Sequence, residues 1–418
     1  MATLASTSRK HVLLFAFGAV GLLNFLICYY YYPLRANYIE DSVGVAGPVS
    51  SPWPPSVPSI ARQAPSPSRV IRIYQHELAC YSNRCWWLQH PNDKCDYRCM
   101  FTGMGKNESA LAEADVVVYD AIASRPREKQ KHQRYIGFYW ESPAIHKMLM
   151  SQNYMSIYDF EYSYRMKADL VDLSSIVEIV GSFEHIATWD VVPFSVKKKN
   201  VMITSWISNC DVTTNGRIPR LEQLISLGVS ARNFGRCALK GGSSLSQYHD
   251  LAWESRSPNY SALKNKSLAI IGATKIPFEN LYEGGVSLFY YAAENSNCEY
   301  YHTEKAWVAL NSGAIPIYLG SNVTARDYFP ENSMIYLADF NSTEDLARHL
   351  VSLSHNESAY NKYLEWRKLP LAHHLKSKID FALKHRNEGQ WCYVCESLHR
   401  QFNRRGRVSR VQDPKFCN

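Results

Sequence analysis

Short apolar runs, bounded by polar residues, recur along the chain and predict buried β-strands. In the first half these runs lie at residues 69–75, 114–120 and 134–142, and they are rich in β-branched and aromatic residues. In the second half, further runs of this kind lie at residues 200–208, 286–294, 314–320 and 333–340. We therefore expect two groups of strands, divided near residue 190.

Segments with helical periodicity lie between the later strands. Residues 217–228 repeat their apolar positions at helical spacing and end at Gly228, a residue typical of helix ends. Residues 303–313 and 341–353 also predict helices, and Thr303 stands at the N-cap position of the first of these two. Strands that alternate with helices predict parallel sheets covered on both faces, so the fold class is α/β.

A longer apolar run, at residues 11–32, contains no Lys, Arg, Asp or Glu and is long enough to span a bilayer. Because Arg9 and Lys10 precede this run, the positive-inside rule predicts a cytosolic tail at residues 1–10 and places the rest of the chain on the far side of the membrane. Residues 33–68, which are rich in Pro and Ser towards their end, predict an extended stem.

Composition indicates a folded protein without a nucleic-acid signature. Hydrophobic residues make up 46% of the chain and charged residues 20%, so the chain can bury a core. The formal net charge of +8 is a mild excess, and no Arg/Lys-rich stripe gathers it, so we expect no nucleic-acid partner. The same excess suits a small anionic substrate.

The cysteines and glycosylation sequons both fit the lumen of the secretory pathway. Of eleven cysteines, Cys28 lies in the apolar run, and the even number that remains favours disulfides over zinc for the paired cysteines of "CDYRC" and "WCYVC". The disulfide candidates are Cys80, Cys85, Cys95, Cys99, Cys210, Cys237, Cys298, Cys392, Cys395 and Cys417. The candidate N-glycosylation sites are Asn107, Asn259, Asn265, Asn322, Asn341 and Asn356.

One polar stretch, residues 294–305, stands between two apolar runs where a predicted strand gives way to a predicted helix. Ligands bind beyond the carboxyl ends of strands in open parallel sheets, and a helix start offers free backbone N–H groups. Lys305 lies in the first turn, where the helix dipole disfavours a cation, so its side chain should reach solvent or an anion such as a diphosphate. A glycine-rich phosphate loop is missing from the sequence, which disfavours ATP and NAD.

The register of this stretch resembles the signature of the lumenal α1,3- and α1,4-fucosyltransferases of glycosyltransferase family ten. The matching positions are Phe289, Glu294, Asn295, Ser296, Tyr301, Thr303, Glu304, Lys305, Gly313, Pro316 and Gly320. The sequence departs from the family pattern at Ala293 and Tyr300. Residues 139–146 ("YWESPAIH"), 162–165 ("YSYR") and 208–210 ("SNC") resemble further family elements, and "CDYRC" and "FGRC" resemble plant Lewis-type and core fucosyltransferases.

The resemblance implies a GT-B architecture of two Rossmann-like domains facing a cleft. Its implied parts are an acceptor-side domain at residues 69–190, a GDP-fucose-binding domain at residues 191–385 and a disulfide-containing C-terminal tail at residues 386–418. The implied reaction is inverting α1,3 transfer of L-fucose from GDP-β-L-fucose to a GlcNAc hydroxyl of a glycoprotein glycan. The implied location is the Golgi membrane, crossed once, with a lumenal catalytic part.

Several alternatives stay open beside that reading. The acceptor chemistry could be α1,4 transfer of the Lewis type or protein O-fucosylation, and another GT-B transferase could use a different nucleotide sugar. A glycan-binding ectodomain without catalytic activity would share the anchor, stem, sequons and disulfides.

The resemblance also assigns roles to single residues. Glu141, which follows a predicted strand, is the candidate catalytic base, and Arg217 and Lys305 are the cations for the leaving diphosphate. The donor-binding candidates, with those two cations, are Arg165, Asn209, Arg217, Glu294, Asn295, Tyr301, Glu304 and Lys305. No Asp-x-Asp motif stands near these positions, so we expect no required metal or other cofactor, although a divalent ion could stimulate the reaction.

Overall fold

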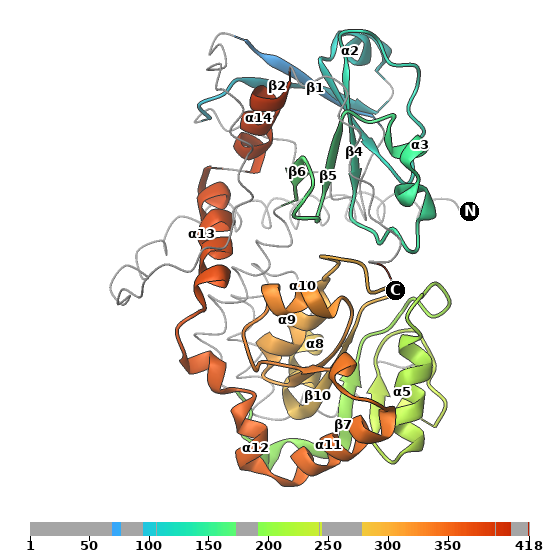
Figure 1. Ribbon diagram of the computed structural model, residues 1–418, viewed down its shortest axis with the longest axis vertical. Coiled ribbons are helices and arrows are strands. Elements are labelled where there is room, and N and C mark those ends of the chain that lie inside the picture. The colour runs from blue at the N-terminus through green and yellow to red at the C-terminus, as the bar shows by residue number, and fades with distance from the viewer. Residues whose placement is uncertain are drawn as a thin grey trace, which may run out of the picture. The chain divides into compact units, whose positions relative to one another are not determined.

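Two parallel β-sheets form the framework of the protein (Figure 1). The structure is a computed structural model, and all the residues it describes belong to one compact unit within residues 52–418. It describes residues 69–76, 95–105, 107–172, 191–241, 243–244, 278–388, 390–402 and 417. Every strand pair in both sheets is parallel, which confirms the predicted α/β fold with parallel sheets.

The first sheet has the strand order β2-β1-β3-β4-β5-β6. Its strands are β1 (Ile71–His76), β2 (Cys99–Gly105), β3 (Val116–Asp120), β4 (Arg134–Tyr139), β5 (Phe160–Ser163) and β6 (Leu170–Val171). The short helices α2 (Glu108–Glu113) and α3 (Gln152–Met155) accompany them. Residues of β1 alternate between the two faces, so that Ile71 and Ile73 enter one core and Tyr74 enters the other.

The tyrosine-rich core on one side of this sheet requires a glycine. Tyr119, Tyr135, Tyr139 and Tyr158 are all buried there. A Cβ atom on Gly137, in the middle of β4, would lie 2.8 Å from ring atoms of Tyr158. The absent side chain therefore leaves room for the ring to lie against the strand.

The second sheet has the strand order β12-β11-β10-β7-β8-β9. Its strands are β7 (Lys198–Ser205), β8 (Ala231–Asn233), β9 (Ser243–Ser244), β10 (Ser287–Ala293), β11 (Ile315–Leu319) and β12 (Ile335–Tyr336). The helices that accompany it are α5 (Arg217–Ser226), α8 (Phe278–Val286), α9 (Glu304–Ser312), α10 (Asn322–Tyr328), α11 (Thr343–His355) and α12 (Glu357–Lys362).

Helices cover both faces of this second sheet. Residues from α8, α9 and α10 pack with Tyr290 and Ala292 of β10 on one face. Residues from α5 and α11 pack with Leu288, Phe289 and Tyr291 on the other. Every residue of β10 is buried, as expected for the central strand of a parallel sheet covered on both sides.

The C-terminal helix α14 (Gln390–Gln401) packs on the first sheet, far from it in sequence (Figure 1). It follows α13 (His373–Glu388) and contributes Val394 and Leu398 to the aliphatic core against β1 and β3. Two disulfides, Cys95–Cys392 and Cys99–Cys395, join the start of β2 and the residues just before it to α14. The predicted tail 386–418 thus contains a helix that completes a core.

The disulfide prediction is confirmed for eight of the ten candidates. Beyond the two bonds to α14, Cys210 pairs with Cys237 and Cys298 pairs with Cys417. The cysteines of "CDYRC" and "WCYVC" bond to one another, as favoured over zinc. Cys80 and Cys85 lie outside the described residues.

Two local predictions were wrong. The predicted strand 333–340 continues only to Tyr336, because the 3₁₀ turn η6 (Leu337–Asp339) redirects the chain towards α11. The cysteine-rich segment between the first two predicted strands, where we predicted no strand, contains β2, in which Gly103 and Gly105 have positive φ angles of 146° and 86°. Such glycines hide the alternation that marks a strand.

Other predictions concern residues that the structure does not describe. The predicted membrane span 11–32 and stem 33–68 lie outside the described residues, as do residues 173–190 at the predicted division. Within the described ranges, the helices are too short or too polar to cross a bilayer. The predicted domain bounds and anchor stay predictions.

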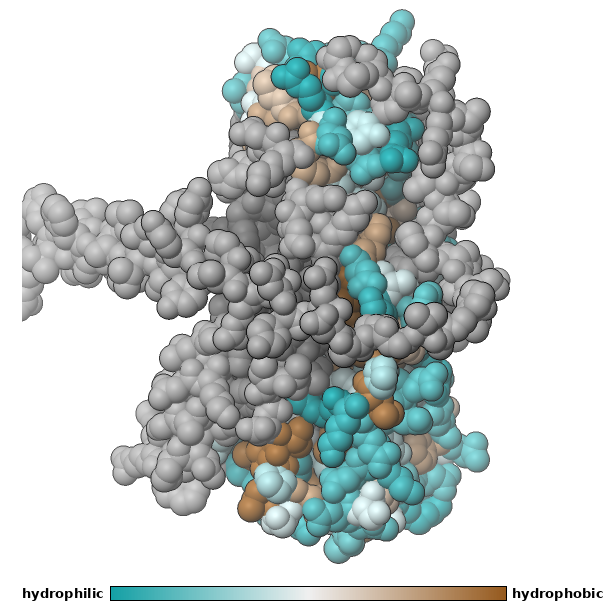
Figure 2. All heavy atoms as spheres, turned by 90° about the vertical axis from the view of Figure 1, so that its left-hand side faces the viewer, coloured by the Kyte–Doolittle hydropathy of each residue, from teal (hydrophilic) through white to brown (hydrophobic). Residues whose placement is uncertain are grey.

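On the face shown in Figure 2, hydrophilic side chains predominate over the lower part and hydrophobic ones form small separate areas. Large exposed hydrophobic residues come from different segments, for example Val196, Val212 and Leu369. Single exposed apolar residues of this kind are normal for a folded protein and indicate no docking site.

We expect the Gly137→Ala variant to lower the free energy of unfolding by about 1–3 kcal/mol, because the new methyl group overpacks the Tyr158 ring. Chemical denaturation measures the change. Adding Tyr158→Leu should cost less than the sum of the single changes, since the smaller side chain relieves the overlap. A wild-type stability for Gly137→Ala would contradict this packing.

Candidate active site

The candidate site lies where the strand order of the second sheet reverses, between β7 and β10. Arg217 begins α5 after β7, and Glu294 follows β10 directly. Residues 294–303, the 294–303 loop, then lead into α9. Ligands of open parallel sheets bind beyond the carboxyl ends of strands at such a reversal, so the position fits the prediction from sequence.

Glu294 holds the two ends of the 294–303 loop together. Its side chain is fully buried, and its Oε1 accepts a hydrogen bond from the backbone N–H of Thr303 at 2.8 Å. Its Oε2 accepts one from the Thr303 hydroxyl at 2.7 Å. Thr303 therefore occupies the predicted N-cap position of α9, but its side chain bonds Glu294 and does not cap the helix. Burial raises the pKa of Glu294, although Lys305 and Thr303 oppose the rise.

Lys305 is paired with protein groups. Its Nζ donates to the Thr303 hydroxyl at 2.8 Å and to Glu304 Oε1 at 3.1 Å, and it lies 3.7 Å from Glu294 Oε2. Burial opposes the charged form, but the carboxylates of Glu304 and Glu294 outweigh it and raise the pKa of Lys305. The lysine is 16% exposed and Glu304 54%, so a bound phosphate could exchange with the more exposed carboxylate.

Arg217 is held by backbone carbonyls. Its Nη1 donates to Ala293 O at 3.1 Å and its Nη2 to Asn209 O at 2.7 Å. Burial lowers the pKa of Arg217, and the nearby carboxylate of Glu294 opposes the change. Among the residues that the structure describes, no carboxylate lies within ion-pair distance of it. The guanidinium therefore keeps a charge that a ligand anion could neutralise. Its charge also reaches Lys305, whose pKa it acts to lower.

Asn209 takes part through its backbone. Its carbonyl accepts from Arg217, while its exposed side-chain Oδ1 accepts from the backbone N–H of Val212 at 3.2 Å. The predicted donor-binding side chain thus stabilises its own loop in this structure.

Tyr301 joins the 294–303 loop to Glu141. The Tyr301 hydroxyl donates to Glu141 Oε2 at 3.2 Å and accepts from Asn295 Nδ2 at 3.2 Å. Burial raises the pKa of Tyr301 well above its usual value, and the charges of Glu141 and Glu294 add to the rise. The tyrosine is therefore neutral and donates to the carboxylate. Glu141, which follows β4 of the first sheet, is half-buried.

The neighbours of these residues also meet. The Ser296 hydroxyl donates to the Ser142 hydroxyl at 2.5 Å, and Ser142 Oγ lies 3.2 Å from Cys298 Sγ. The Cys298–Cys417 disulfide adds a covalent bond to the same loop. The predicted base and the predicted donor loop are thus brought together by several contacts.

Arg165, a predicted donor-binding residue, is engaged elsewhere. Its Nη1 lies 3.1 Å from Glu161 Oε1 and 3.2 Å from Oε2, and both side chains are buried. Burial opposes its charge, but Glu161 and Tyr139 outweigh it and raise the pKa of Arg165. Glu161 also accepts hydrogen bonds from the hydroxyls of Tyr139 and Ser163. This network stabilises the first sheet, and the predicted contact of Arg165 with the donor stays a prediction.

Two residues beside the site were missed from sequence. The Tyr164 hydroxyl is buried and has no hydrogen-bond partner among the described residues, and its ring lies edge-on to that of Tyr301 at 5.4 Å. His302 Nδ1 lies 2.7 Å from the hydroxyl of Tyr318, and burial lowers the pKa of His302 to about 3. The sequence indicated these two residues only through their position inside the segments that resemble the family, residues 162–165 and 294–305. A buried hydroxyl or a neutral histidine leaves no recognisable sequence pattern.

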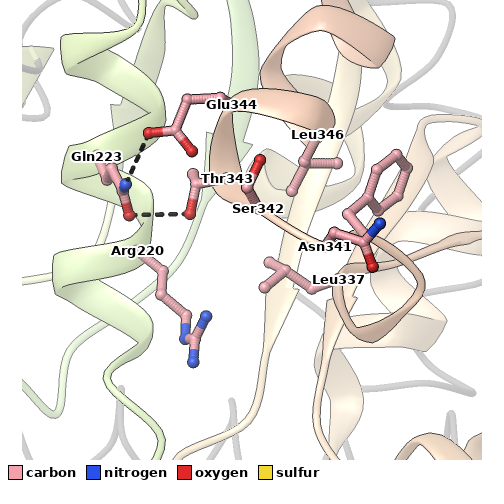
Figure 3. Close-up of a pocket in the computed structure, with 9 residues that line it drawn as sticks. Arg220, Gln223, Leu337, Asn341, Ser342, Thr343, Glu344 and Leu346 are labelled. Carbon is pink, nitrogen blue, oxygen red and sulfur yellow. Dashed lines mark hydrogen bonds between the residues drawn. The ribbon is translucent and has the colours of Figure 1, made fainter.

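A separate polar cavity of about 310 Å³ lies between α5 and the start of α11 (Figure 3). Gln223 bridges its two sides, since it accepts from the Thr343 hydroxyl at 2.8 Å and donates to Glu344 at 3.3 Å. Arg220 lines it one helical turn after Arg217. None of the predicted catalytic or donor-binding residues lines this cavity.

The described sequons differ in accessibility. Asn107, Asn341 and Asn356 are exposed, and Asn107 and Asn356 also cap α2 and α12. Asn322 is half-buried in α10, and the hydroxyl of its sequon residue Thr324 is buried and accepts from the backbone N–H of Tyr300. Asn259 and Asn265 lie outside the described residues.

Protonation of unfolded histidine should make the protein less stable in mild acid. Because the folded pKa of His302, about 3, lies below the value of 6.5 for an unperturbed histidine, the unfolded chain binds a proton that the folded chain does not. Its contribution to the free energy of unfolding should fall by about 2 kcal/mol between pH 7.5 and pH 5. Denaturation at several pH values measures this. The free energy of unfolding of His302→Asn should lack the fall between pH 7.5 and pH 5, whereas His355→Asn, changed at an exposed position, should show the same fall as wild type. Equal pH dependence in wild type and His302→Asn would contradict the assignment.

Comparison with known proteins finds a family match in the C-terminal part of the chain. Residues 282–413 match the family model for the C-terminal part of glycosyltransferase family 10 (fucosyltransferase). Glycoprotein 3-alpha-L-fucosyltransferase A of Drosophila melanogaster is 38% identical over 117 residues, which are 27% of this chain and 20% of the relative. GDP-fucose protein O-fucosyltransferase 3 of Gallus gallus is 25% identical over 251 residues, 59% of this chain and 47% of the relative.

A crystal structure of an α1,3-fucosyltransferase with GDP-fucose aligns with a TM-score of 0.44 and 14% identity, over 81% of this chain and 94% of that one. The chain spans between 20% and 47% of the length of these two curated relatives. The matched residues 282–413 include β10, the 294–303 loop and α9, which carry the motif recognised in the sequence. Through this segment the chain is similar to the C-terminal part of glycosyltransferase family 10 (fucosyltransferase).

Proposed function

We propose that this protein is an inverting α1,3-fucosyltransferase that moves L-fucose from GDP-β-L-fucose to a GlcNAc hydroxyl of a glycoprotein glycan. One observation carries the proposal: a single loop joins a carboxylate, Glu141, to a site with two cations, Arg217 and Lys305. Displacement of a nucleotide diphosphate by a hydroxyl needs a proton acceptor on one side of the reacting carbon and positive charge on the other. The match of residues 282–413 to the fucosyltransferase family model supports a sugar-nucleotide donor.

The proposed reaction is a single displacement. The acceptor oxygen attacks the anomeric carbon of fucose while Glu141 takes the hydroxyl proton, so that a new C–O bond forms. The bond from that carbon to the diphosphate oxygen breaks, and GDP leaves with the electron pair. Attack opposite the leaving group converts the β linkage of the donor into an α linkage. Arg217 and Lys305 stabilise the negative charge that develops on the diphosphate.

Donor binding is proposed to rearrange the ion pairs of the site. Lys305 exchanges the Glu304 carboxylate for phosphate oxygens, and Glu304, which is 54% exposed, turns to hydroxyls of the donor. The unpartnered Tyr164 hydroxyl is a further candidate for a sugar hydroxyl, because a buried hydroxyl is stabilised when a ligand supplies its partner. We propose no required metal, since the two side-chain cations supply charge at the diphosphate.

The wider setting is proposed on similar grounds. The two parallel sheets would be the halves of a GT-B enzyme, with the donor on the second and the acceptor on the first. The apolar run 11–32 would anchor the chain once in the Golgi membrane, with the catalytic part in the lumen. Disulfides and exposed sequons among the described residues support an oxidising lumenal compartment.

A second acceptor class is favoured by one comparison. The match to GDP-fucose protein O-fucosyltransferase 3 of Gallus gallus spans 251 residues, more than twice the 117 residues matched in the Drosophila melanogaster relative. A Ser or Thr hydroxyl of a protein is therefore the alternative acceptor, with the same donor and the same proposed base.

The Glu141→Gln variant tests the proposed function. With GDP-fucose and a panel of GlcNAc-containing glycans and folded protein acceptors, wild type should release GDP and form an α-fucoside. Glu141→Gln should lower kcat by roughly 10²–10⁴-fold, because the base is lost, and should still bind GDP. Calorimetry and product analysis provide the measurements. Wild-type GDP binding without turnover on any acceptor would instead support a glycan-binding protein.

Arg217→Lys tests the diphosphate site. The lysine keeps the charge but loses the planar group that bonds several oxygens at once, so GDP affinity should fall on the order of tenfold. Arg220→Lys, one helical turn further along α5 on its exposed side, is the matched control and should bind GDP like wild type. Equal affinities for both variants would contradict the role of Arg217.

A further inference from the structure

The Tyr301 hydroxyl lies between the residues proposed to bind the donor and the residue proposed to act as base. Its oxygen is 3.2 Å from Glu141 Oε2 and 3.2 Å from Asn295 Nδ2. We propose that Tyr301 is a positioning residue, whose hydroxyl orients the Glu141 carboxylate so that the 294–303 loop sets the geometry of the base. This inference rests on the proposed function and differs from the prediction that Tyr301 contacts the donor.

The contact engages one oxygen of the carboxylate. No other hydrogen bond to the Glu141 side chain comes from the part of the chain that the structure describes. A carboxylate held at Oε2 alone can still rotate about this contact, yet it keeps Oε1 available for an acceptor proton. The bond therefore restricts the base without occupying the atom that would do the chemistry.

The direction of the hydrogen bond is fixed by the surroundings of Tyr301. Burial raises the pKa of Tyr301, and the carboxylates of Glu141, Glu294 and Glu304 raise it further. The cation Arg217 also interacts with Tyr301 electrostatically, but burial and the three carboxylates outweigh it. The phenol is therefore neutral and donates to Glu141. Asn295 Nδ2 donates to the phenol oxygen, and such a chain of hydrogen bonds strengthens the next donor in line.

The ring cannot move freely away from Glu141. It packs edge-on against Tyr164 at 5.4 Å within the tyrosine-rich core. The loop segment between Asn295 and Tyr301 is held by the Ser296–Ser142 hydrogen bond and by the Cys298–Cys417 disulfide. At its far end the loop is closed by Glu294 on Thr303. A donor bound at Thr303–Lys305 would therefore act on a loop that is already joined to the base.

The test compares Tyr301→Phe with the neighbouring Tyr300→Phe in the full-length protein. Loss of the hydroxyl in Tyr301→Phe should lower kcat on the order of tenfold and leave the KM for GDP-fucose within about twofold of wild type. The acidic limb of the pH–rate profile should move to higher pH, because the carboxylate loses a hydrogen bond that favours its charged form. Tyr300→Phe should keep the wild-type kcat and profile.

A second variant guards against loss of fold. If Tyr301→Phe melts before it can be assayed, Asn295→Leu removes the amide that donates to the phenol and should shift the same limb in the same direction by a smaller amount. The proposal is overturned if the variant that folds keeps the wild-type pH profile, or if Tyr301→Phe raises the KM for GDP-fucose with kcat unchanged. Absence of wild-type turnover would overturn the proposed function itself, which distinguishes the two failures.

Discussion

The candidate site depends on one buried carboxylate. Glu294 ends the central strand of the second sheet and binds both the backbone N–H and the hydroxyl of Thr303, so the eight residues between them form a closed loop. Closing the loop fixes where α9 begins and brings Lys305 near a second negative charge. A buried carboxylate is tolerated only when hydrogen bonds and a cation compensate its desolvation, and this site supplies both.

The charges around this loop are nearly balanced before any ligand arrives. Glu294 and Glu304 offset Lys305, while Arg217 donates to the backbone carbonyls of Ala293 and Asn209. A bound dianion would meet Arg217, which the backbone carbonyls already orient, and Lys305, which can exchange the exposed Glu304 carboxylate for the ligand. The carboxylates of Glu294 and Glu304 reduce the repulsion between the two cations, since like charges near one another repel.

Periodicity and motif register predicted most of what surrounds the site, because the central strands are buried runs and the loop carries an uncommon order of polar residues. Other features depend on tertiary partners that a sequence does not display. Thr303 was predicted to cap α9, yet the carboxylate of Glu294 competes for its hydroxyl. Arg165 forms an ion pair with a buried glutamate four residues earlier, which its sequence motif did not indicate, and its contact with the donor stays a prediction. The predicted strand ends at Tyr336, because the next three residues form a 3₁₀ turn that leads the chain towards α11.

The position of α14 has a consequence for synthesis. The helix covers one face of the first sheet, and its cysteines bond partners 297 and 296 residues earlier in the chain. While the ribosome makes the intervening segment, that face and the thiols of Cys95 and Cys99 have no native partners. The first sheet therefore cannot complete this core or these two disulfides before α14 has been synthesised, so the amino-terminal half does not reach its native state as an independent co-translational unit.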